Sequence, residues 1–250
     1  MDGVPLAARF SIATNRLNYC GPAEAAPHLY RAIVTDRGDP PARQALEGFE
    51  ALLPYLQAIG AKHGLDPLDR RVVEAYWIGN ELLDAFRPSD FPPLLDALHR
   101  RGLPQSIVSR LTSHLPADPI PHHVFHVAFV GVGAVTGHVP TTLANLEACR
   151  PAWALVRSRS LESLEVVRPS LRVEDGRLLW GRDVDASLAY DARVVPDAGP
   201  GQSVVVHWGW PALTPTAGQL ENLRTFTDRA LAAANEALPA LGVFEKSSAG

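Results

Sequence analysis

The sequence predicts an α+β protein, in which a mainly helical domain (residues 1–148) precedes a small β-barrel with a C-terminal helix (residues 149–244). Between residues 23 and 112, apolar side chains recur every three or four positions between Pro and Gly breaks, which is the period of amphipathic helices. After the first domain the chain changes to short β-branched stretches followed by one long helical segment, a pattern typical of a small barrel. Residues 245–250 are expected to be a frayed tail.

Composition places the chain among ordinary globular proteins. It has 250 residues, of which 46% are hydrophobic and 20% charged, so we expect a packed core. The formal net charge is -4 with both signs interspersed, which predicts no nucleic-acid partner. An acidic start and the lack of a long apolar run predict a cytoplasmic protein with no membrane partner. The two cysteines, Cys20 and Cys149, are too few for a disulfide framework and are expected to be free thiols.

In the helical domain, start signals define two helices. Asp66 is a suitable N-cap for a helix over Leu68–Phe86, and Ser89 similarly opens a helix over Phe91–Arg101. The apolar run Val124–Val135 is rich in β-branched residues and glycine, so helix and strand both remain open there.

In the second domain we expect short strands and one helix. Asp175-Gly176 supplies a hairpin turn, Pro200-Gly201 precedes the last strand, and Thr214-Pro215 opens the final helix, 216–237. On a strand through residue 210, Trp208 and Trp210 would share one face and His207 the other. The expected strands are 153–157, 164–167, 171–173, 178–180 and 203–210.

The segment Asp197–Gly209, in which a Pro-Gly turn leads into an apolar strand ending in His-Trp-Gly, resembles the hallmark strand of HypC-type [NiFe]-hydrogenase maturation chaperones. The resemblance covers about the last 100 residues and includes a cysteine at the start of the first strand, which is Cys149 with Val156 seven residues later. It implies a HypC/OB-like barrel, and it implies that Cys149 and His207 help to carry an iron centre. The implied partners are hydrogenase maturation proteins or a hydrogenase large subunit.

The whole chain also resembles an uncharacterised bacterial family associated with hydrogenase maturation genes. That resemblance implies a biological setting and no mechanism. The matching phrases are Tyr19-Cys20-Gly21-Pro22, Val73-Glu74-Ala75-Tyr76-Trp77, Gly79-Asn80, Pro121-His122-His123, Phe125-His126 and His207-Trp208.

Three histidines, His122, His123 and His126, form a cluster after a proline. On a helix, the four-residue step from His122 to His126 puts both imidazoles on one face at metal-binding separation. On a strand the same two residues lie about 13 Å apart, too far for one ion. The alternative interpretation is that these histidines cap and hydrogen-bond a buried turn.

Cys20 lies just before an expected helix, whose N-terminus would lower the pKa of the thiol and make it nucleophilic. A small buried thiol in a turn is the alternative. Glu74 and Tyr76 lie on an expected helix, where Glu74 can act as a base or a metal ligand, although a solvated helix face explains it as well.

These observations support three hypotheses. The first is a metal-handling accessory protein related to hydrogenase maturation, which carries iron on Cys149 and His207; we expect these two side chains within about 5 Å of each other. The second is an enzyme dependent on iron, zinc or another first-row metal, with the histidine cluster as its site and Glu74 as its base. The third is an amide hydrolase with Cys20 as nucleophile.

Overall fold

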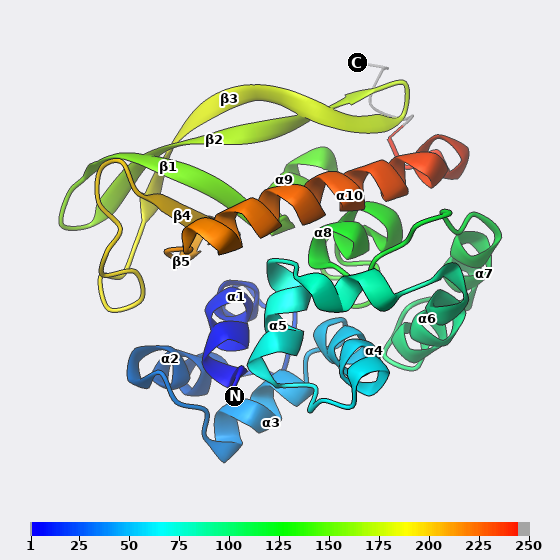
Figure 1. Cartoon of the computed structure of the whole chain (residues 1–250), viewed down its shortest axis with the longest axis horizontal. Coiled ribbons are helices and arrows are strands. Elements are labelled where there is room, and N and C mark those ends of the chain that lie inside the picture. The colour runs from blue at the N-terminus through cyan, green and yellow to red at the C-terminus, as the bar shows by residue number, and fades with distance from the viewer. Residues whose placement is uncertain (1, 245–250) are drawn as a thin grey trace.

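The protein is described by a computed structural model over residues 2–244, and the expected tail lies outside the described residues. Its architecture is α+β, with N-terminal helices, a five-stranded antiparallel sheet and a long C-terminal helix (Figure 1). The elements are α1 Val4–Arg16, α2 Ala26–Thr35, α3 Pro40–Glu47, α4 Leu52–His63, α5 Arg70–Trp77, η1 Glu81–Ala85, η2 Pro88–Asp90, α6 Phe91–His99, α7 Gln105–Ser113, α8 His123–Phe125, η3 His126–Gly131, α9 Leu143–Cys149, β1 Ala152–Arg159, β2 Ser163–Glu174, β3 Arg177–Ala189, β4 Ser203–His207, β5 Trp210–Leu213 and α10 Ala217–Leu241.

The long helix α10 separates the sheet from most of the other helices. In Figure 1 the sheet lies above α10, and helices α1 to α8 lie below or beside it. Contacts of α10 with β3 on one side and with α8 and η3 on the other support this layered arrangement. One apolar core runs through both parts of the chain, because buried residues of the helices and of the sheet belong to a single cluster.

The sheet has the strand order β3-β2-β1-β4-β5 and is open, so the strands do not close into the expected small barrel. Both edges have features that discourage closure. On β3, the side-chain amide of Asn235 from α10 donates to the carbonyl oxygen of Leu178 and accepts from its N–H, each at 2.8 Å. On the other edge, β5 has only four residues, and one of them is Pro211, which has no N–H to donate to a further strand.

Local turn chemistry shapes the strands. The expected Asp175-Gly176 turn joins β2 to β3, with φ of 50° and 72° at its two residues. A similar turn at Trp208-Gly209, with φ of 52° and 72°, ends β4 at His207 and starts β5. Two adjacent residues with positive φ form the tight turn that matches the twist of a hairpin. The single strand expected over 203–210 is therefore two strands, and the alternation of faces expected at its end does not apply.

The helical part differs from expectation at both ends of α5 and at the start of α6, whose N-cap is Asp90 and not Ser89. Asp69, and not Asp66, caps α5, accepting from the N–H of Arg71 at 2.9 Å. This helix ends at Trp77, before the expected end, and Gly79 follows with φ of 97° and its backbone against the ring of Phe226. The segment left open between helix and strand is helical at first, running through α8 into the π-helix η3.

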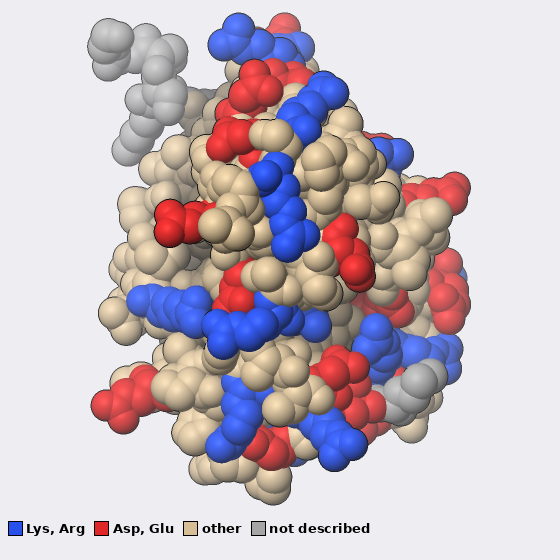
Figure 2. Space-filling model, turned by 90° about the vertical axis from the view of Figure 1, so that its left-hand side faces the viewer, with Lys and Arg blue, Asp and Glu red and all other residues tan. Residues whose placement is uncertain are grey.

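The described surface has mixed charge where Figure 2 shows it. Cationic and anionic side chains alternate over that face, and no large area of one sign stands out. Within residues 2–244, no helix combines the length and the apolar character needed to cross a bilayer.

Candidate metal centre

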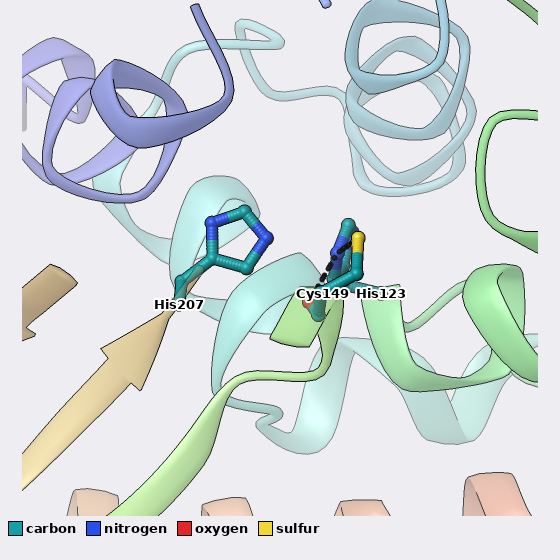
Figure 3. A group of neighbouring side chains, drawn as sticks. All are labelled: His123, Cys149 and His207. Carbon is teal, nitrogen blue, oxygen red and sulfur yellow. Dashed lines mark hydrogen bonds between the residues drawn. The ribbon is translucent and has the colours of Figure 1, made fainter. Parts of the chain in front are cut away.

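Three buried side chains from distant parts of the chain converge where the helices meet the sheet. They are His123 at the start of α8, Cys149 at the end of α9 and His207 at the end of β4. One ligand atom from each lies within 4.8 Å of the other two. Figure 3 shows the His207 ring extending from β4 toward Cys149 and His123. The expected proximity of Cys149 and His207 is therefore confirmed, and His123 is added to the pair.

The backbone joins the two elements that carry Cys149 and His207. The N–H of Trp208, in the turn after β4, donates to the carbonyl oxygen of Ala148 at 2.6 Å. Each bonded residue is the neighbour of a site residue, so this bond holds the end of β4 against the end of α9. Cys149 belongs to α9 and precedes the first strand by three residues, whereas the family resemblance placed it at the strand's start.

His207 is oriented by helix α1. Its Nδ1 lies 2.7 Å from the carbonyl oxygen of Phe10, which can only accept, so Nδ1 carries the proton and donates. The other nitrogen, Nε2, therefore bears the lone pair. This atom is buried and has no hydrogen-bond partner among the described residues. An imidazole fixed by Nδ1 with a free Nε2 is the usual state of a metal-ligating histidine.

His123 is held by Tyr76, whose hydroxyl lies 2.9 Å from Nδ1 of the imidazole. Its Nε2 lies 3.1 Å from the carbonyl oxygen and 3.6 Å from the Sγ of Cys149. The carbonyl oxygen can only accept, so in the metal-free structure Nε2 donates to it and Nδ1 accepts from the hydroxyl of Tyr76. A metal on Nε2 requires the other tautomer, in which Nδ1 donates to the oxygen of Tyr76, and a tyrosine hydroxyl can accept as well as donate. Metal bonds of about 2.3 Å to sulfur and about 2.0–2.1 Å to nitrogen, at a tetrahedral angle, put those ligands about 3.6 Å apart. The observed separation matches this value.

Electrostatics keep the imidazoles neutral. Burial lowers the pKa of His207 to about 4, and burial together with the neighbouring His207 lowers the pKa of His123 well below its ordinary value. Neutral imidazole is the form that binds metals. Burial, with a smaller contribution from Cys20, raises the pKa of the Cys149 thiol. A metal must therefore displace the thiol proton when it binds, which couples binding to pH.

A cavity of about 60 Å³ adjoins the three ligands. Aromatic and aliphatic side chains make up most of its wall, among them Trp77, whose ring lies 4.2 Å from that of His123 and 5.1 Å from that of His207. No Lys, Arg, Asp or Glu of the described chain lines it. The polar or sulfur-bearing lining residues besides the three ligands are Ser11, Thr14, Tyr19, Cys20, Tyr76, Trp77, His126, Thr136 and Trp208.

The histidine cluster divides into three separate environments. His122 is the N-cap of α8, where Nδ1 accepts from the N–H of Val124 at 3.2 Å, and its ring stacks on Phe226. His126 begins the π-helix, and its Nδ1 lies 3.1 Å from the hydroxyl of Tyr55. Neither belongs to the group that can share one ion, so the structure does not bring His122 and His126 together as a metal pair. Of the cluster, His123 alone faces Cys149.

Cys20 lines the same cavity as His207, but its thiol is not activated. Burial raises the pKa of Cys20 to about 12, with a smaller contribution from the negative charge of the Glu50 carboxylate. The expectation of a lowered pKa is wrong for a local reason, since α2 begins only at Ala26, five residues after Gly21.

The two other expected catalytic residues have different positions. Glu74 accepts from the side-chain amide of Gln219 at 2.6 Å and so ties α5 to α10, and it does not line the cavity. Tyr76 lines the cavity and positions His123. Sequence reasoning missed Phe10 and Ser11 of α1, because a buried backbone carbonyl and a lone serine leave no pattern in a sequence.

Residues 1–240 match the family described as DUF6390, a family of unknown function. The chain belongs to DUF6390. No curated protein and no solved structure matches it. Membership of DUF6390 assigns no activity, so the functional argument depends on the buried His-Cys-His group.

Proposed function

We propose that this DUF6390 protein binds one transition-metal ion, iron or zinc, through His123, Cys149 and His207. The observation that carries the proposal is the Nε2 atom of His207. It is buried, unprotonated and without a hydrogen-bond partner in the described structure, and the His207 imidazole offers a nitrogen within 4.8 Å of the sulfur of Cys149 and of a ring nitrogen of His123. A polar atom buried without a partner costs about 1–3 kcal/mol, and a metal ion would remove that cost.

The donor set supports iron or zinc. Two imidazoles and one thiolate suit borderline metals of the first transition row. Magnesium and calcium prefer oxygen ligands, and none of the three side chains supplies one. Three protein ligands leave one coordination position open in a tetrahedral site, and the 60 Å³ cavity adjoins the ligands. Open positions of this kind belong to sites that bind or transform a further molecule.

The proposed biological setting is hydrogenase maturation, with the protein acting as an accessory that holds iron for a maturation partner or a large subunit. The support is the resemblance to HypC-type chaperones, together with the closeness of the two residues that it singles out, Cys149 and His207. All three ligands are at most 7% exposed, so a carrier of this design has to expose them before it can hand over its metal.

The cavity beside the ligands favours a second candidate, a metal-dependent enzyme that uses the same three ligands. A carrier needs a route for the ion to leave, whereas an enzyme needs an enclosed space beside an open coordination position. Capture of hydrogenase maturation proteins or a large subunit by the tagged, metal-bound chain would favour the carrier. Retention of the metal without such capture would favour the enzyme.

The direct test is metal analysis of the full-length protein purified without oxygen. We expect about one equivalent of iron or zinc per chain, and loss of that metal in a Cys149→Ser/His207→Asn double variant. A His126→Gln variant is the matched control, because His126 is an equally buried imidazole of the same region outside the three-ligand group. Metal-free wild type after reconstitution, or full occupancy in the double variant, would refute the proposal.

A further inference from the structure

Three features together define what the cavity beside the three ligands can accept: the charge of a bound metal, the volume of the cavity and the buried hydroxyl of Ser11. We infer that the open coordination position takes a small monoanion of two to four non-hydrogen atoms, with one polar atom on the metal and a second held by the hydroxyl of Ser11. The inference rests on the proposed function, since it needs a metal on His123, Cys149 and His207.

Charge balance calls for an anion. A divalent ion bound by one thiolate and two neutral imidazoles keeps one net positive charge. No charged side chain of the described chain lines the cavity to balance it. An uncompensated buried charge is costly, and a monoanionic ligand in the fourth position removes it. Hydroxide from water is the smallest such ligand, and the cavity has room for more.

Ser11 supplies a polar contact, and it is the one hydroxyl of the described cavity lining that is buried without a partner; the indole N–H groups of Trp77 and Trp208 are the other unpartnered donors there. The Ser11 side chain is 2% exposed, lines the cavity, and has no hydrogen-bond partner for Oγ among the described residues. It follows Phe10 on α1, whose carbonyl oxygen orients His207, so the hydroxyl and the metal ligand are positioned by one turn of helix. A buried hydroxyl without a hydrogen-bond partner is unfavourable, and a ligand atom in the cavity would accept a hydrogen bond from it.

The volume limits the ligand. A cavity needs about 10–15 Å³ to hold one water molecule, and a cavity of about 150 Å³ holds benzene. The observed 60 Å³ therefore has room for roughly four water-sized atoms. Formate is the simplest molecule that meets all three conditions, because one carboxylate oxygen can bind the metal while the other accepts from Ser11.

The test compares three probes on the Co²⁺-loaded full-length protein, whose visible absorption reports on the ligands of the ion. We expect formate to change the spectrum and to bind at least about tenfold more tightly than formamide, which has the same shape without the charge. Benzoate, which is too large, should not bind. Ser11→Ala should weaken formate about tenfold or more, as expected for a hydrogen bond to a charged group. Thr227→Val is the matched control, since its hydroxyl is also buried without a partner but does not line the cavity.

The outcomes separate the two proposals. If Co²⁺ binds but formate and formamide bind alike, or benzoate binds as well as formate, the inference is overturned and the metal site stands. If Co²⁺ does not bind to wild type, the proposed function fails first. The comparisons of charge and size need wild-type protein alone, so they decide the inference even if Ser11→Ala does not fold.

Discussion

Replacing Tyr76 by Phe should weaken metal binding without disturbing any ligand. The change removes one oxygen atom, which lies 2.9 Å from Nδ1 of His123. In the metal-bound form Nδ1 has to be protonated, and the hydroxyl oxygen of Tyr76 accepts a hydrogen bond from it and so fixes the required tautomer. Loss of such a hydrogen bond typically reduces metal affinity by about 10–100-fold, or about 1.4–2.7 kcal/mol of binding free energy.

The chain provides a matched control in Tyr55→Phe. Tyr55 is also fully buried, and its hydroxyl lies 3.1 Å from Nδ1 of His126, which is outside the three-ligand group. Both variants remove a buried tyrosine–histidine hydrogen bond, so each should lower the free energy of unfolding of the metal-free protein by about 1 kcal/mol. Only Tyr76→Phe should change metal affinity.

Competition with a chromophoric chelator measures the metal affinity, and urea unfolding measures the stability of the metal-free protein. Equal losses of affinity in the two variants would mean that the effect comes from general destabilisation. An unchanged affinity in Tyr76→Phe would show that Tyr76 does not position His123. Either result would refute the assigned role of Tyr76.

Two further predictions follow from the pKa shifts. Burial lowers the pKa of His122 to about 3 and of His126 to about 4, so the unfolded chain binds protons that the folded chain does not. The two neutral histidines therefore stabilise the fold fully above the ordinary pKa of about 6.5, and this stabilisation is lost as the pH falls toward the lowered pKa values. Urea unfolding of the metal-free protein should show a free energy of unfolding about 2 kcal/mol lower per histidine at pH 5 than at pH 7. Equal free energies at the two pH values would contradict this prediction. Because the pKa of Cys20 is raised to about 12, iodoacetamide should label Cys20 slowly at neutral pH. The labelling rate should rise about tenfold for each added pH unit, since only the thiolate reacts. Rapid labelling at pH 7 would show an activated thiolate instead.

Local chemistry made the α+β class and several boundaries predictable from the sequence. The Asp175-Gly176 turn needs two residues that tolerate positive φ, and both the residue types and the conformation agree. The final helix begins at Ala217, one residue after the expected start, and its cap is Thr216 and not Thr214, accepting from the N–H of Gln219 at 3.2 Å. The proximity of Cys149 and His207 was expected from a family resemblance and from no local pattern.

Tertiary structure alone decided which histidine joins that pair. His122, His123 and His126 are equivalent in the sequence, but a cap bond, a tyrosine hydroxyl and the start of a π-helix direct them to different neighbours. The edge of β3 is bonded at Leu178 by Asn235 of α10, and the raised pKa of Cys20 depends on burial and Glu50. Turns and caps depend on residues a few positions apart, which a sequence displays directly. The site depends on contacts such as that between Phe10 and His207, 197 positions apart, which exist only once the core has packed.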